Sequence, residues 1–138
     1  MPSKLLPDEY KALLDKAIPT MKALSHLKIE PLFWNDNNKE DFYCIAGIYV
    51  VRCGSYTNLH WAKNISGAID DKLDYLEARS NKINLILQQY YDNGHKPYFW
   101  ITSFCATHDE PVLKALKRQE KLRMEEEIKP FIYGDDHP

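Results

Sequence analysis

The sequence predicts a single α/β (α+β) domain with a small central sheet of about three strands, in β-β-α-α-β-α order, and an added N-terminal helix. Two observations predict this class. The chain has 138 residues, 44% hydrophobic and 28% charged, which is the size and composition of one globular domain. Along it, runs of β-branched and aromatic residues alternate with segments in which apolar residues recur at helical spacing.

Residues 1–41 are expected to form an extension that precedes the core. Apolar residues recur at helical spacing within residues 8–25, with Pro7 in front and Pro19 as the site of a kink. Residues 28–33 are a candidate short strand, and the WNDNNKED stretch after them is dense in turn-forming and charged residues. We therefore expect a helix, a short strand and a loop before residue 42.

The core is expected to begin with a β-hairpin. Residues 42–52 are rich in β-branched and aromatic side chains and run into a Cys-Gly-Ser turn, and residues 56–61 form a second, shorter candidate strand. Two helices should follow. Asn64 can cap the first, which runs through Leu76, and the second extends from Ser80 to the Asn93-Gly94 pair.

A third strand and a charged helix complete the expected core. Residues 97–105 are aromatic and β-branched. Asp109 and Pro111 then form a helix start, and Leu113, Leu116 and Met124 lie along the helix. These elements place the core at residues 42–130 and an irregular tail at residues 131–138 within one domain spanning residues 1–138.

Several classes of protein are disfavoured by composition. The longest nearly uncharged apolar run, residues 42–51, is about half of the roughly 20 residues that a membrane span needs, so no membrane partner is expected. The N-terminus has no secretory pattern, and Cys44, Cys53 and Cys105 have no CxxC spacing, which favours reduced thiols in a cytoplasmic or nuclear setting. The net charge of −2 requires any polyanion site to be local.

The strongest local charge bias lies in the last predicted helix. Lys114, Lys117, Arg118 and Lys121 share one helical face, with Glu120 as the acid among them. Such a face is either a solvated helix surface or a phosphate-binding surface. A second open alternative concerns five aromatic residues that precede this helix. They either fill the core or stack on single-stranded bases: Tyr90, Tyr91, Tyr98, Phe99 and Trp100.

A set of short motifs stands in a recognisable order. The chain has Gly47-Ile48-Tyr49 in its first core strand and His60-Trp61-Ala62 at the end of the second, followed by Asn64 to Ala68, a helical stretch from Asn81 to Gly94, and Glu120 ahead of Lys129-Pro130. In order and spacing this series resembles the GIY-YIG nucleases, over roughly two thirds of the chain. We therefore expect a GIY-YIG-like core.

The resemblance implies a catalytic set of which much is missing. In the family, one divalent metal is held by a Glu, tyrosines position the water, and an Arg contacts the scissile phosphate. The matching positions here carry Tyr49, His60, Ala68, Lys72 and Glu120, so the Arg and the second Tyr are lost. The resemblance thus implies Glu120 as a ligand of Mg²⁺, Tyr49 and His60 as catalytic candidates, and Lys63 as a weak substitute for the Arg.

Three functional interpretations follow. The leading one is a degenerate GIY-YIG-type domain that binds nucleic acid, with DNA favoured, through Lys63, Lys72 and the basic helix face, and with weak or lost endonuclease activity. The first alternative is a divergent Mg²⁺-dependent DNA endonuclease. The second is a protein-interaction module with no nucleic-acid role. The family suggests a phage, mobile-element, restriction or repair setting.

A geometric expectation separates these interpretations. If Tyr49 and Glu120 form one active site, the tyrosine hydroxyl and the carboxylate should open onto the same cleft, bordered by Lys63 or Lys72. If instead Glu120 points to bulk solvent on the side of its helix away from the sheet, or Tyr49 is sealed in the core, neither residue carries chemistry.

Overall fold

A computed structural model describes residues 32–127 of the chain, with the side chains of residues 33–123. The predicted helix in residues 8–25, the tail from residue 131 and the Lys129-Pro130 pair lie outside the described residues. Within them, no helix is long and apolar enough to cross a membrane.

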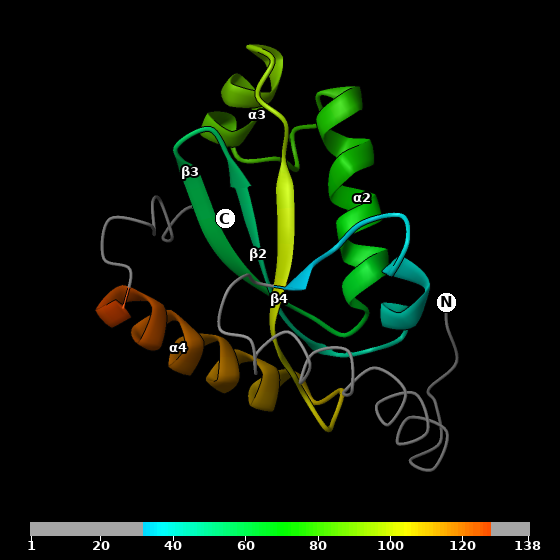
Figure 1. Cartoon of the computed structure of the whole chain (residues 1–138), viewed down its shortest axis with the longest axis vertical. Helices are drawn as coiled ribbons and strands as arrows, with labels where there is room; N and C mark the ends of the chain where they lie inside the picture. The colour runs from blue at the N-terminus through cyan, green and yellow to red at the C-terminus, as the bar shows by residue number, and fades with distance from the viewer. Residues whose placement is uncertain (1–31, 128–138) are drawn as a thin grey trace.

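The predicted α+β class and order of elements are confirmed. The order is β2 (Gly47–Cys53), β3 (Tyr56–Ala62), α2 (Ile65–Ala78), α3 (Leu85–Asp92), β4 (Tyr98–Phe104) and α4 (Glu110–Glu127), preceded by β1 (Leu32–Phe33) and a 3-10 helix, η1 (Lys39–Phe42). Figure 1 shows α2 beside the strands, α3 beyond the turn between β2 and β3, and α4 crossing near the end at which β2 begins.

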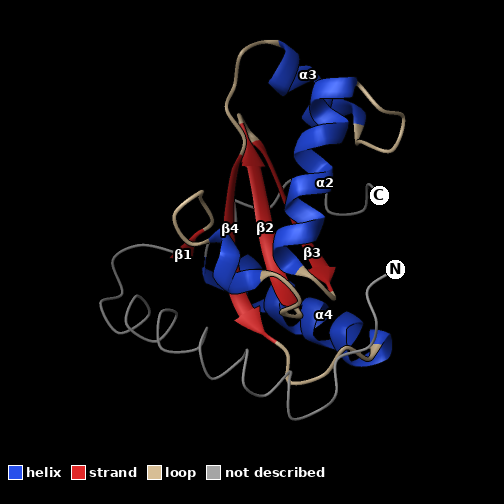
Figure 2. Ribbon diagram, turned by 90° about the vertical axis from the view of Figure 1, so that its right-hand side faces the viewer, coloured by secondary structure: helices blue, strands red, loops and turns tan. Residues whose placement is uncertain are grey.

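The sheet is antiparallel throughout the described residues, with strand order β1-β4-β2-β3. The strand β2 is therefore central, between its hairpin partner β3 and the later β4 (Figure 2). Short β1 adds only two residues to the far edge of β4.

Two apolar clusters hold the layers together. The larger one joins alternate residues of β2, including Tyr49 and Val51, to Ile69 of α2 and Leu87 of α3. The smaller one contains Ile48, Val50, Leu59 and Trp100, with Leu116 of α4 packed against it. Since successive strand residues point to opposite faces, β2 is covered on both faces, as its nearly continuous burial requires.

The predicted start of the first core strand is wrong by five residues. Phe42 ends η1 and is fully buried, and the strand begins only at Gly47. Between them the chain reverses at Cys44, which adopts a positive φ of 64°. The amide of Cys44 donates to Oδ1 of Asn64, the N-cap of α2, which also accepts from the amide of Gly67 at 3.0 Å.

The second helix is also shorter than predicted. It begins at Leu85 rather than at Ser80, because Asn84 caps it by accepting from the amides of Ile86 and Leu87. Ser80 instead accepts a turn hydrogen bond from the amide of Lys82. This agrees with the general rule that Asn and Ser side chains stabilise both helix starts and turns.

Candidate nucleic-acid interface

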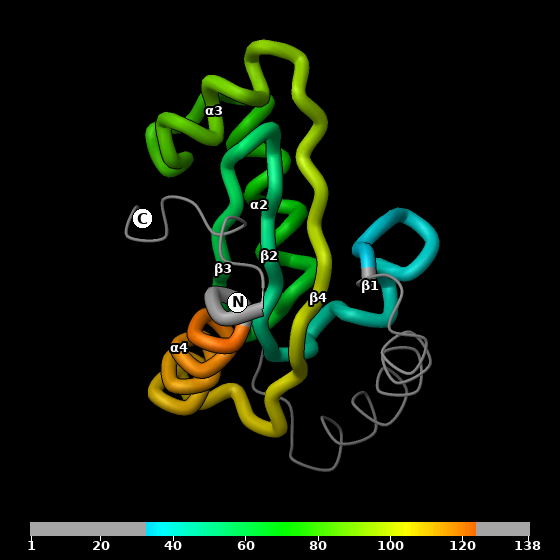
Figure 3. Tube along the Cα trace, turned by 60° about the vertical axis from the view of Figure 1, so that its left-hand side comes forward, coloured from blue at the N-terminus to red at the C-terminus, as the bar shows by residue number. Residues whose placement is uncertain are grey.

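The basic side chains of α4 form a groove beside the edge strand β3. The groove has a volume of about 290 Å³ and is lined by Trp61 of β3 and by Lys114, Lys117, Arg118 and Lys121 of α4. Leu113 and Leu116 pack α4 against the sheet, so the basic residues beside them on the helix lie along the edge strand β3. In Figure 3, α4 lies below β3, which is the strand that supplies Trp61. We call this site the basic groove.

The positive charge of the basic groove is only partly balanced. Lys114 forms an ion pair with Glu110 at 3.1 Å. Among the described side chains of residues 33–123, neither Lys117 nor Arg118 has an ion pair. Burial lowers the pKa of Lys117, and the charge of Lys121 lowers it further. Bringing an anion into the groove would relieve this repulsion.

Two further titratable groups, His60 of β3 and Lys72 of α2, lie outside the lining of the basic groove. His60 packs its ring on Tyr49, with centroids 5.4 Å apart. Burial lowers the pKa of His60 well below its usual range, and the charges of Lys72 from α2 and Lys117 from α4 add to this. The Nε2 atom of His60 is buried without a hydrogen-bond partner. Burial and these two like charges therefore disfavour protonation of His60.

Lys72 is itself mostly buried, and burial lowers its pKa to about 8. The predicted nucleic-acid set is therefore only partly brought together. Lys114, Lys117, Arg118 and Lys121 line one groove, whereas Lys72 of α2 does not line it. Lys63 is exposed in the turn after β3 and does not line the groove.

The expectation that the Tyr49 hydroxyl opens onto a cleft is wrong. The Tyr49 side chain is only 3% exposed and belongs to the larger apolar cluster. Burial raises the pKa of its hydroxyl well above the usual range, so it does not ionise near neutral pH. The physical reason is that both faces of the central strand are covered.

Glu120 is buried as well, with 8% exposure, and its charge is already neutralised. Its Oε2 accepts from Nε of Arg123 at 3.1 Å and its Oε1 from the terminal guanidinium nitrogen at 3.2 Å. Within the described part of the chain, no group of three or more His, Cys, Asp or Glu side chains is arranged to hold a metal ion. In this arrangement Glu120 does not fit the role of a magnesium ligand.

Sequence reasoning missed the role of Trp61. It entered only as the middle residue of a motif, although an aromatic residue in an edge strand beside a basic helix is a recognisable stacking candidate. Its contact with the basic face depends on how α4 docks, which local patterns do not reveal.

Comparisons with protein-family models, with curated proteins and with solved structures gave no match. Function is therefore inferred below from the residues and geometry of this chain.

Replacing Lys72 by methionine should stabilise the protein at pH 7 by on the order of 1 kcal/mol, because the variant no longer buries a charge. The folded-state pKa of about 8 lies below the unfolded value. Between those two pKa values the unfolded chain binds a proton that the folded protein lacks, so stability of the native protein rises with pH. Urea midpoints measured from pH 7 to pH 10 should show the two proteins converging.

The matched control is Lys63→Met, which removes the same charge from an exposed position. The difference in urea midpoint between Lys63→Met and the native protein should stay nearly constant across the same pH range. A constant difference for Lys72→Met would contradict the buried position of the ammonium group.

Proposed function

We propose that this protein is a nucleic-acid-binding domain of the GIY-YIG type, with DNA as the favoured ligand and with weak or lost endonuclease activity. The observation that carries the proposal is the convergence of four cationic side chains around Trp61 in the basic groove. A lysine ammonium binds a backbone phosphate as a point charge, and an arginine guanidinium can donate two parallel hydrogen bonds to it. An aromatic ring can stack on a base or sugar.

Charge balance supports binding at this site. Lys117 and Arg118 have no ion pair with the side chains of residues 33–123, and Lys117 is partly buried beside Lys121. A phosphate placed there would replace repulsion between like charges with attraction in a poorly solvated groove. The chain as a whole carries a charge of −2, so attraction should be local, and affinity modest.

Loss of cleavage is supported by two features, one in α2 and one in α4. Ala68 stands where the GIY-YIG resemblance calls for an arginine, and an alanine cannot stabilise charge on a phosphate. The carboxylate of Glu120 is bound on both oxygens by Arg123. Binding needs only the exposed cations and therefore survives these losses.

Charge reversal at Lys117 and Lys121 should weaken binding to duplex DNA by at least about 10-fold at low salt. The slope of log K against log salt should also become shallower by about 0.9 for each phosphate that the variant no longer neutralises. Fluorescence anisotropy of a labelled duplex, titrated at several salt concentrations, measures both quantities.

The matched control is Arg79→Glu with Lys82→Glu, which makes the same change in net charge. Arg79 and Lys82 are both exposed, around the turn that follows α2, and away from the basic groove. The control should bind as the native protein does. Equal weakening of DNA binding by both double variants would show that net charge alone attracts the DNA. Undetectable binding by the native protein at low salt would favour the protein-interaction alternative.

A further inference from the structure

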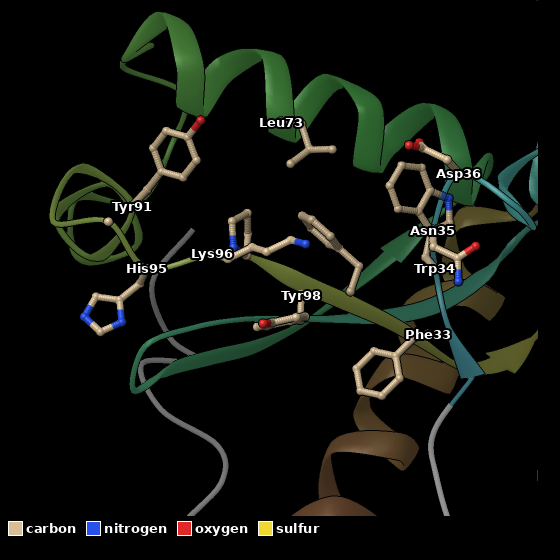
Figure 4. A pocket seen from close by; sticks show the side chains of 12 residues that line it. Phe33, Trp34, Asn35, Asp36, Leu73, Tyr91, His95, Lys96 and Tyr98 are labelled. Atoms are coloured by element: carbon tan, nitrogen blue, oxygen red, sulfur yellow. The ribbon is translucent and has the colours of Figure 1, made fainter.

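A second concave site lies at the other end of the molecule, between α2, the loop after β1 and the chain that leads into β4 (Figure 4). It has a volume of about 760 Å³, which is within the range of small-molecule pockets. Its walls carry five aromatic residues and one inward-directed lysine: Phe33, Trp34, Tyr91, Tyr98, Phe99 and Lys96. We call it the aromatic pocket.

Two pairs of rings in the aromatic pocket meet edge to face, and Phe33 and Tyr98 are the more exposed pair. Phe33 and Tyr98 meet edge to face, with centroids 6.4 Å apart, and Trp34 meets Phe99 in the same manner at 6.0 Å. Tyr98 is 51% exposed and Phe33 37% exposed, which is unusual for large aromatic side chains in a domain of this size. Edge-to-face pairs leave a ring face free to stack on a planar ligand.

Hydrogen bonds fix the wall formed by Trp34. Its Nε1 donates to Oγ of Ser66 at 3.0 Å, and that hydroxyl donates to the carbonyl of Lys39 at 2.6 Å. The backbone of Trp34 is also tied to the sheet, since its amide donates to the carbonyl of Phe99 at 2.8 Å. The ring is therefore positioned before any ligand arrives, which lowers the entropic cost of binding.

The polar groups of the pocket are distributed asymmetrically. The ammonium group of Lys96 is directed into the pocket (Figure 4) and lies 5.8 Å from the Tyr98 ring centroid. Asp36 lies at the opposite end, beside Asn35. Oδ1 of Asn35 accepts from the amides of Asn37 and Asn38, so the side-chain amide of Asn35 presents its NH₂ group as a donor.

We propose that the aromatic pocket binds one unpaired nucleotide of a single-stranded nucleic acid, with the base stacked among the rings and its phosphate on Lys96. The carboxylate of Asp36 repels a phosphate at its own end, so the base lies toward Trp34 and Asn35. The proposal rests on the proposed function only in taking nucleic acid as the ligand. It adds a second binding point, chemically distinct from the basic groove because stacking rather than charge dominates it.

Replacing Tyr98 by alanine should weaken binding of a short fluorescein-labelled oligothymidylate about 5- to 150-fold, the range expected for loss of one base–aromatic stack. Tyr98→Phe keeps the ring and should stay within about twofold of the native protein. Lys96→Gln should weaken binding and reduce its salt dependence by about 0.7 in log-log slope, for one single-strand phosphate.

Leu85→Ala is the matched control, because Leu85 is also a large exposed apolar side chain but does not line the pocket. Circular dichroism of each variant verifies the fold, and Tyr98→Phe tests the ring independently of any loss of folding by Tyr98→Ala. The inference is overturned if Tyr98→Ala, when folded, binds the oligonucleotide as tightly as the native protein. It is also overturned if Tyr98→Phe binds as weakly as Tyr98→Ala.

The two proposals fail separately. If duplex binding depends on Lys117 and Lys121 while single-strand binding ignores Tyr98, the aromatic pocket is excluded and the basic groove stands. If duplex binding is absent but oligothymidylate binding depends on Tyr98, the basic groove is excluded and the pocket stands. Displacement of the oligonucleotide by an aromatic acidic peptide at lower concentration than by unlabelled oligothymidylate would overturn the choice of ligand.

Discussion

Replacing Gly47 by alanine should lower the free energy of unfolding by about 3 kcal/mol or more, which is a large part of the stability of a small domain. A β-carbon at Gly47 would lie 2.2 Å from the carbonyl oxygen of Ser103 and 3.1 Å from the α-carbon of Phe104. Both atoms are backbone atoms of the neighbouring strand β4, so β2 and β4 would have to separate. Urea unfolding followed by circular dichroism measures the loss.

Gly94→Ala is the control for this effect. A β-carbon at Gly94 meets nothing within 4 Å, but its φ of 95° is unfavourable for alanine, so a cost of about 1–2 kcal/mol is expected from the backbone alone. A Gly47→Ala variant as stable as the native protein would show that the strands are not in such close approach. The glycine of the Gly-Ile-Tyr motif thus has a structural explanation that is independent of catalysis.

Purified protein should nick supercoiled DNA in the presence of Mg²⁺ no faster than background. Loss of an arginine on the phosphate typically costs about 10²- to 10⁵-fold in rate, and Ala68 stands where the GIY-YIG resemblance would place that arginine. In addition, the hydroxyl of Tyr49 is enclosed in the core and Glu120 is bound by Arg123. Gel electrophoresis of plasmid incubated with and without Mg²⁺ gives the measurement.

Robust nicking that Glu120→Ala abolishes and Glu110→Ala preserves would contradict this expectation and favour the divergent-endonuclease alternative. Glu110 is a suitable control because it lies on the same helix and is more exposed. A gain of activity in the Ala68→Arg, His60→Tyr double variant would support the GIY-YIG resemblance. It would also show that the enclosure of Tyr49 can open when a substrate binds.

The order of helices and strands could be predicted because each element carries its own periodic pattern. The boundaries that failed did so for physical reasons. Phe42 to Ala46 is apolar like a strand, but its burial comes from a 3-10 turn and a reversal at Cys44 that Asn64 stabilises from 20 residues away. A short apolar run does not by itself distinguish these conformations.

Only those parts of the candidate site that depend on residues close together in the sequence could be predicted. The spacing of Lys114, Lys117, Arg118 and Lys121 places them on one helical face, and they do line one groove. The burial of Tyr49 agrees with its place in a nearly continuous apolar run, which is typical of a strand covered on both faces, whereas the family resemblance had placed its hydroxyl at a cleft. The contacts of Trp61 and His60 depend on docking of α2 and α4 against the strand.

The central position of β2 also constrains how the chain folds during synthesis. Its hairpin partner β3 follows after a two-residue turn, whereas β4, its other partner, begins at Tyr98. Until the ribosome has released that segment, one edge of the Ile-Tyr-Val-Val run stays unpaired and open to other chains. The sheet therefore closes late, and nascent chains halted between α3 and β4 should be the species that most require chaperone protection.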